Sequence, residues 1–96
     1  MFKELDPLLH SQLRLQIISL LIQVEYASFN YLLETTGATK GNISTQINKL
    51  KEAEYISVSK EFKDNYPLTT CKITQKGKKA FEEYVKALQS YIDPKV

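Results

Sequence analysis

A helix stop and a helix start stand almost side by side near the middle of this chain. Gly37 is the residue type that most often ends a helix in the left-handed conformation, and Thr39 is a typical helix N-cap. Only Ala38 lies between them. Two helices joined this tightly must turn sharply against each other, so the segment predicts a helix-turn-helix.

Apolar residues at helical spacing support both of these helices. Ser28 is expected to cap the helix before the turn. The helix after the turn is predicted over residues 39–54, where Ile43, Ile47 and Leu50 form an apolar stripe along one side. We expect this stripe to face the core.

Further helix starts are predicted near both ends of the chain. The pair Asp6-Pro7 is typical of a helix start, and Ser11 can cap a second one shortly after it. Thr74 is expected to cap a last helix over residues 74–92, which carries a wide apolar stripe. Together with the helix-turn-helix, these signals predict a mainly α-helical chain.

The hydrophobic period changes from helical to alternating after the helix-turn-helix. Residues 56–59 and 70–73 alternate apolar and polar side chains, which is typical of half-buried strands. Between them, residues 62–67 are interpreted as a polar turn in which Pro67 ends the strand pairing. The sequence therefore predicts a β-hairpin over residues 56–73.

The predicted order is helix, helix, helix, hairpin, helix, and it resembles a known family. The resemblance lies in residues 5–15, 39–50, 52–56 and 66–77 and covers nearly the whole chain. These stretches resemble the small, single-domain winged-helix transcription regulators related to the MarR and ArsR groups. The resemblance implies a winged helix-turn-helix of order α-α-α-β-β-α, with a small β-hairpin wing and a long C-terminal dimerisation helix.

The length of the chain allows one domain over residues 1–96, with residues 1–10 as an N-terminal extension. Its net charge is only +2, but residues 39–79 carry nine lysines against four carboxylates. The flanking segments are mildly acidic. This concentration of basic charge indicates an anionic partner, although a run of charge is also typical of a solvated face.

The side of helix 39–54 that lies opposite the apolar stripe carries small and amide side chains. Such side chains read base edges in the major groove, and they are poor helix formers for a face that is merely solvated. Lysines of the hairpin would contact phosphates without reading sequence. The predicted DNA-binding residues are Thr39, Lys40, Gly41, Asn42, Ser44, Thr45, Asn48, Lys49, Lys60, Lys63 and Lys72.

Both ends of the chain carry more apolar residues than a small core obviously uses. We expect a homodimer in which the last helix packs on its symmetry mate, with the N-terminal segment beside it. The alternative is that the two ends cover each other within one monomer. The predicted dimer interface consists of Phe2, Leu5, Leu9, Phe81, Tyr84, Val85, Leu88, Tyr91 and Ile92. A two-fold dimer would bind double-stranded DNA at a near-palindromic operator.

No catalytic, metal or cofactor site is expected. His10 is the only histidine and Cys71 the only cysteine, so neither a nucleophile–base pair nor a metal-ligand set can be assembled. We expect His10 to help order the start of the first helix. Cys71 is expected to be a small buried residue on the strand face that it shares with Ile73.

No apolar run approaches the ~20 residues of a membrane span, and the acidic N-terminus is unlike a secretory signal. We therefore expect a cytoplasmic, non-enzymatic DNA-binding regulator, acting as a dimeric repressor. One alternative is a winged-helix module that docks another protein. Another is a sensor of a small-molecule effector of unknown identity, with its pocket lined by tyrosines such as Tyr26, Tyr31, Tyr84 and Tyr91.

Overall fold

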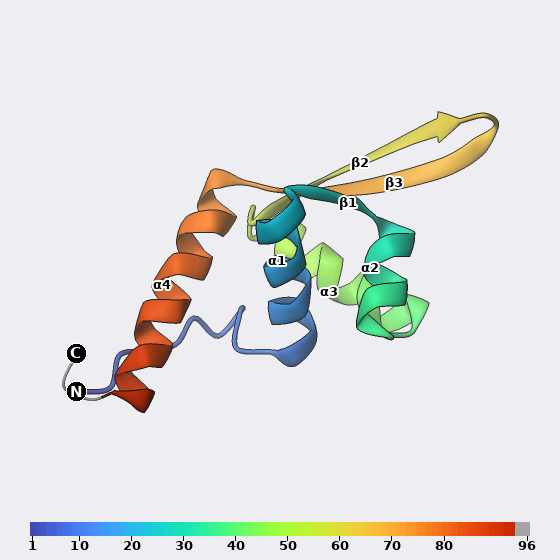
Figure 1. The fold of residues 1–96 in the computed structure, drawn as a ribbon. Helices are drawn as coiled ribbons and strands as arrows, with labels where there is room; N and C mark the ends of the chain where they lie inside the picture. Colours follow the sequence, from blue (N-terminus) through green and yellow to red (C-terminus); the bar gives the residue numbers. More distant parts are fainter. Residues whose placement is uncertain (94–96) are drawn as a thin grey trace.

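The computed structural model describes residues 1–93 and shows the predicted mainly α architecture with a hairpin wing (Figure 1). Residues 94–96 of the predicted domain lie outside the described part. The elements, in chain order, are α1 (Gln12–Val24), β1 (Tyr26–Ser28), α2 (Phe29–Thr36), α3 (Lys40–Glu52), β2 (Ile56–Lys63), β3 (Tyr66–Ile73) and α4 (Gln75–Ile92).

Helices α2 and α3 form the helix-turn-helix that the sequence predicts. Gly37 has φ 71°, and its N–H donates to the Leu33 carbonyl, which ends α2. Thr39 caps α3, since its hydroxyl accepts from the Asn42 N–H at 3.2 Å. Ser28 caps α2 in the same way, accepting from the Tyr31 N–H at 3.0 Å. These three local predictions are confirmed.

The predicted helix start at Asp6-Pro7 is wrong, because only a single turn forms there. The Asp6 carboxylate accepts from the Leu8 N–H at 2.9 Å, and the Asp6 carbonyl accepts from the His10 N–H at 2.9 Å. Leu9 in this turn is fully buried. To bury Leu9, the chain bends toward the core at this point and does not continue as a helix. Ser11 occupies the N-cap position of α1 but makes no side-chain capping bond.

The three strands form an antiparallel sheet in the order β1-β3-β2. Strand β1 has no counterpart in the predicted order. It is three residues long and pairs with residues 70–72 of β3, so its existence depends on a partner far along the chain.

The hairpin turn is tighter than the sequence predicts. Asp64 and Asn65 alone form it, both with positive φ (53° and 67°), and Lys63 pairs with Tyr66 directly beside them. Pro67 therefore does not end the pairing but lies within β3, opposite Phe62. In a two-residue hairpin this second pair exchanges no hydrogen bonds, so the missing N–H of proline is tolerated there.

One core joins the helix-turn-helix, the sheet and the inner side of α1. The predicted stripe Ile43, Ile47 and Leu50 is buried, as is Cys71 with Ile73. Burial raises the pKa of the Cys71 thiol to about 11, so the thiol stays protonated near neutral pH. Cys71 thus has the environment of a small core residue, as predicted.

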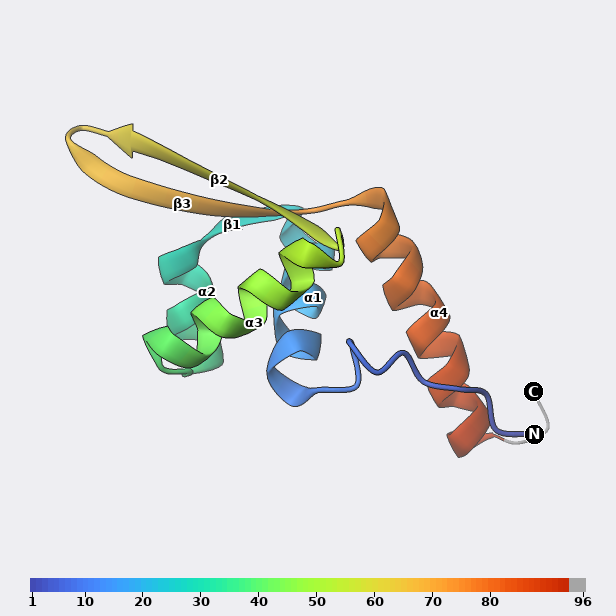
Figure 2. The same ribbon diagram turned by 180° about the vertical axis from the view of Figure 1, so that it is seen from behind.

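Helix α4 and the hairpin extend from opposite ends of the molecule, which measures 55 × 25 × 21 Å (Figures 1 and 2). The N-terminal segment runs along the far part of α4 in both views. At the other end of α4, Gly77 packs so closely that a Cβ would lie 2.2 Å from the Tyr55 carbonyl oxygen. Within residues 1–93, no helix combines the length and apolar character that crossing a membrane requires.

Candidate nucleic-acid interface

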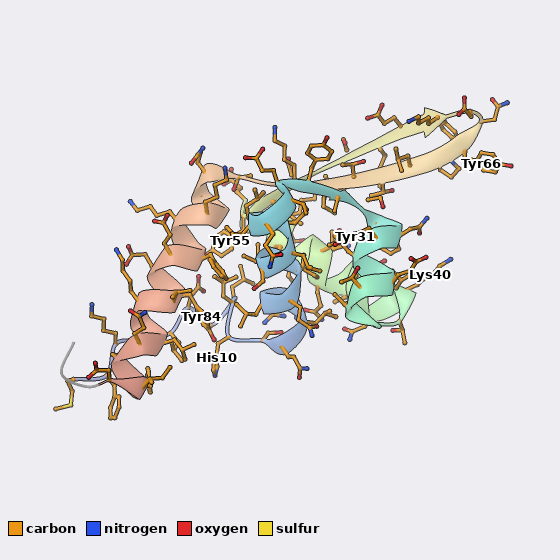
Figure 3. All side chains as sticks on the ribbon, viewed as in Figure 1. His10, Tyr31, Lys40, Tyr55, Tyr66 and Tyr84 are labelled. Atoms are coloured by element: carbon orange, nitrogen blue, oxygen red, sulfur yellow. The ribbon has the colours of Figure 1, made fainter. Side chains whose placement is uncertain are left out.

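Helix α3 presents two chemically distinct faces. Its apolar stripe is buried, whereas all eight predicted contact residues on or before the helix are exposed. Lys40, at the start of α3, points into solvent at the end of the molecule that carries the hairpin (Figure 3). The exposed residues are Thr39, Lys40, Gly41, Asn42, Ser44, Thr45, Asn48 and Lys49.

A short chain of hydrogen bonds orients part of this exposed face. Arg14 of α1 donates through a guanidinium nitrogen to the Gln46 side-chain oxygen at 2.5 Å. The Gln46 amide in turn donates to the Asn42 side-chain oxygen at 3.0 Å. The Asn42 oxygen is thereby occupied, and its NH₂ group remains available as a donor. Arg14 and Gln46 were absent from the predicted site, because only the packing of α1 on α3 brings them together.

The remaining polar side chains of the exposed face of α3 differ in whether they form hydrogen bonds within the described residues. The Thr45 hydroxyl donates to the Gly41 carbonyl at 3.0 Å. Asn48 and Lys49 make no side-chain hydrogen bond or ion pair within residues 1–93. Their donors and acceptors are therefore free for an external ligand.

A groove separates α3 from the hairpin, and predicted contact residues from both elements line it. Ser44 and Asn48 contribute from α3, while Lys60 of β2 and Thr69 of β3 contribute from the hairpin. Phe29, Ile47 and Val58 form its apolar floor. The fold thus brings Lys60 beside α3, although the two elements are predicted from unrelated sequence signals.

The three hairpin lysines do not share one face of the sheet. Lys60 pairs with Thr69 on the same face as the buried Cys71 and its partner Val58, which is the face turned toward α3. Lys72 pairs with Ser57 and Tyr26 on the opposite face. The structure therefore does not bring Lys72 together with α3.

Lys63 also alternates onto the face opposite Lys60, but it lies next to the two-residue turn at the end of the hairpin. Its cross-strand partner Tyr66 points outward at the tip (Figure 3). At the tip of a twisted two-stranded ribbon both faces are open to solvent. Lys63 is accordingly exposed to solvent.

The predicted dimer residues divide into three groups by their exposure. Leu9 is fully buried and Tyr84 is 5% exposed, so both belong to the core of a single chain and are removed from the interface. Leu5 and Phe81 are partly buried against that core. The exposed members are Phe2, Val85, Leu88, Tyr91 and Ile92.

The two chain ends partly cover each other, as the alternative interpretation of these residues expects. The rings of Phe2 and Tyr91 stack with their centroids 4.9 Å apart. The Lys3 N–H donates to the Ser90 hydroxyl, and the Tyr91 hydroxyl donates to the Lys3 carbonyl, each at 2.9 Å. These contacts fix the N-terminal segment on α4 but leave Val85, Leu88 and Ile92 uncovered.

His10 joins the start of α1 to α4. Its Nδ1 lies 3.1 Å from the Tyr84 hydroxyl, and the two side chains face each other in Figure 3. A second hydrogen bond connects the N-terminal turn to the segment between α3 and β2. In it, the Tyr55 hydroxyl donates to the Asp6 carboxylate at 2.5 Å. Burial, and then the hydrogen bond and charge of Asp6, raise the pKa of Tyr55 to about 12. These polar contacts hold α4 against the start of α1 and the N-terminal turn against the segment that follows α3.

Relatives of this chain are found among both sequences and structures. An uncharacterised protein of Methanocaldococcus jannaschii is 37% identical over 76 residues, which are 79% of this chain and 83% of that protein. The structure of a transcriptional regulator homologue from Pyrococcus horikoshii superposes with a TM-score of 0.85 at 25% identity, covering 91% of this chain and 86% of that one. A candidate transcriptional regulator of Thermoplasma acidophilum superposes with a TM-score of 0.68 at 27% identity, covering 88% and 85%.

The family comparison agrees with the geometry of α2, α3 and the hairpin. Residues 13–92 match the family model described as the winged helix DNA-binding domain. This match spans every helix and strand except the first residue of α1. The chain therefore belongs to the winged helix DNA-binding domain family.

Proposed function

We propose that this protein is a sequence-specific, double-stranded DNA-binding transcription regulator that acts as a dimeric repressor. One observation carries the proposal. Polar residues of α3 and Lys60 of the hairpin line the same groove, so one ligand can contact both. A DNA duplex offers partners to both kinds of residue. Its major groove exposes base edges for the polar side chains of α3, and the phosphates beside that groove suit Lys60.

In this proposal α3 enters the major groove, which accepts one helix. The Asn48 side chain makes no hydrogen bond within residues 1–93 and suits adenine, whose major-groove edge offers one acceptor and one donor. The Asn42 NH₂ group, held outward by Gln46, supplies a donor at the helix start. Lys49 reaches guanine or a phosphate, and the Thr45 methyl group suits a thymine methyl. Gly41 has open space around its missing Cβ, which permits a close approach of the backbone.

The hairpin supplies the backbone contact. Lys60 lies across the protein's groove from Asn48. A DNA backbone seated in this groove therefore has α3 on one side and the Lys60 ammonium group, which can neutralise a phosphate, on the other. Lys63 stands on the opposite face of the hairpin, next to the turn, so in this proposal its ammonium group approaches a phosphate around the tip and not through the groove. Lysine contacts of this kind position a protein on DNA and make its binding dependent on salt.

Dimerisation through α4 is supported by a second apolar stripe beside the one that faces the core. Phe81, Val85, Leu88 and Ile92 follow the four-three-four spacing of a coiled-coil seam. Val85 and Leu88 are each 37% exposed and Ile92 is 77% exposed, which a partner helix would cover. A two-fold pair would place two α3 helices about 34–36 Å apart on successive major grooves, which implies a near-palindromic operator.

Repression is the proposed mode because a single domain of this size offers little surface for recruiting polymerase. The competing role of a protein-docking module requires apolar anchors where α3 is exposed. Within residues 1–93, none of the exposed large apolar side chains lies on α3. The chemistry of this face therefore favours DNA.

Selection of bound duplexes from a random pool tests the proposal. We expect enrichment of a near-palindrome whose half-sites lie one helical turn apart. The selection is repeated with Lys49→Ala and, as a matched control, with Lys86→Ala, which replaces a lysine that is also exposed, on α4. Weaker enrichment for Lys49→Ala alone would support α3 as the contact. The absence of any consensus from the wild-type pool would refute sequence-specific binding.

A further inference from the structure

We propose that the tip of the hairpin inserts Phe62, backed by Pro67, as an apolar wedge into the minor groove and bends the duplex. This inference rests on the proposed DNA-binding function and specifies how the wing contributes to it. It also adds Phe62 and Pro67 to the contact residues, which were sought only among polar and basic side chains.

The hairpin tip is apolar as well as basic. Phe62 is 79% exposed and Tyr66 is 75% exposed, and Pro67 is exposed beside them. Phe62 and Pro67 are cross-strand partners, so their side chains stand next to each other on one face of the ribbon. An aromatic ring and a proline ring thus form a small apolar tip on a segment that otherwise carries lysines.

This apolar pair points toward the same ligand as α3. Alternation along β2 places Val58, Lys60 and Phe62 on one face. Val58 and Lys60 line the groove beside α3, which identifies that face as the one turned toward the helix. Tyr66 pairs with Lys63 on the opposite face. A duplex held by α3 therefore meets Phe62 and not Tyr66.

The reach of β2 toward the hairpin tip comes within a few ångströms of the spacing between neighbouring grooves of DNA. The four residue steps from Val58 to Phe62 cover about 13 Å at a rise of ~3.3 Å per residue. Neighbouring major and minor grooves lie about half a helical turn apart, or ~17 Å. With α3 in the major groove, Lys60 meets the phosphate backbone between the grooves, and Phe62 reaches the minor groove beyond it.

The chain has no free arginine for the other common minor-groove contact. Arginine reads narrow minor grooves, but Arg14 is the only arginine and its guanidinium is engaged with Gln46 and the Leu8 carbonyl. Many proteins that bind the minor groove insert Phe, Leu or Pro between base steps and kink the duplex by about 20–90°. The kink is least costly at pyrimidine–purine steps, so the inference also predicts a preference for such a step under the wing.

The test measures the bend of the selected duplex by energy transfer between dyes at its ends, with the full-length protein bound. The wild type should bend the duplex, and Phe62→Ala should remove most of the bend while lowering affinity about tenfold, as expected when one base–aromatic stack is removed. Phe62→Leu should restore the bend, because leucine also serves as a wedge. Tyr66→Ala, on the opposite face, should bend the duplex like the wild type.

Two results separate this inference from the proposed function. If the wild type binds its selected duplex tightly but Phe62→Ala bends it equally, the wedge is refuted while DNA binding stands. If the wild type binds no duplex specifically, both fail. A third result, in which Phe62→Ala lowers the oligomeric mass and leaves the bend unchanged, would assign the tip to a contact between copies and overturn the wedge. Phe62 is largely exposed, so its replacement should leave folding intact.

Discussion

Asn48 of α3 and Lys60 of β2 line opposite sides of one groove. Neither residue contacts DNA by virtue of its type alone, since asparagine and lysine are common on solvated surfaces. What favours a DNA contact is that both residues line the same groove. In the proposed complex, a duplex that offers its bases to Asn48 also places a phosphate backbone beside Lys60. The groove is also lined by core residues such as Ile47, which hold α3 and the hairpin next to each other.

The salt dependence of binding should distinguish the hairpin lysines from one another. Lys60→Ala removes an ammonium group beside α3, so the slope of log affinity against log salt should become shallower by about 0.9 for each phosphate that is no longer neutralised. Lys72→Ala removes the same charge from the opposite face of the sheet and serves as the matched control. Equal slopes for Lys60→Ala and the wild type would contradict the placement of the backbone in the groove.

The oligomeric state should depend on the second apolar stripe of α4. Leu88→Asp places a charge in the middle of this stripe, and we expect it to halve the mass measured by light scattering. Lys86→Asp introduces the same side chain at an exposed position of α4 outside the stripe, and the dimer should survive it. A wild-type monomer, or a Leu88→Asp dimer, would show that α4 is not the interface.

Two glycines should respond in opposite ways to alanine. At Gly77 a Cβ would meet the Tyr55 carbonyl oxygen at 2.2 Å, so Gly77→Ala should lower the free energy of unfolding by about 1–3 kcal/mol. At Gly41 nothing lies within 4 Å, so Gly41→Ala should raise it by up to ~1 kcal/mol through helix propensity. The measurement is denaturant unfolding of both variants. The same Gly41→Ala protein should bind DNA more weakly, because the added methyl group obstructs the approach of the backbone to α3.

Stability in alkali should reveal the hydrogen bond between Tyr55 and Asp6. The pKa of Tyr55 is raised to about 12, whereas an unfolded tyrosine titrates near 10. The folded state therefore retains this proton more strongly, and its contribution to stability is complete below about pH 10 and is lost as the pH rises toward 12. Tyr55→Phe cannot ionise, so its free energy of unfolding should fall less steeply over that interval. A wild-type protein with the same pH dependence as Tyr55→Phe would contradict the shifted pKa.

Local signals in the sequence predicted the helix-turn-helix well because they act within a few residues. Ser28, Gly37 and Thr39 each satisfy backbone groups of their own helix, so their roles do not depend on the rest of the fold. Strand β1 escaped prediction because it forms only against β3. The start at Asp6-Pro7 was misjudged for a related reason, since the burial of Leu9 bends the chain there.

The candidate site was only partly predictable for the same physical reason. Exposure of the predicted DNA-binding residues of α3 follows from helical periodicity, which places them opposite Ile43 and Ile47. The position of Lys72 could have been read from the alternation with Cys71 and Ile73, whose burial turns Lys72 outward. The hydrogen bond from Arg14 to Gln46, by contrast, requires knowledge of how α1 packs on α3.

The most direct test of sequence reading by α3 is the ratio of affinities for the selected duplex and for a shuffled duplex of the same composition, measured at physiological salt. We expect a ratio of about 10³ or more for the wild type and for Gln23→Ala, which changes an exposed amide on α1. Asn48→Ala should lower the ratio by about tenfold or more, as expected when one bidentate base pairing is removed. A wild-type ratio near one, or an unchanged ratio for Asn48→Ala, would contradict the reading of DNA sequence by α3.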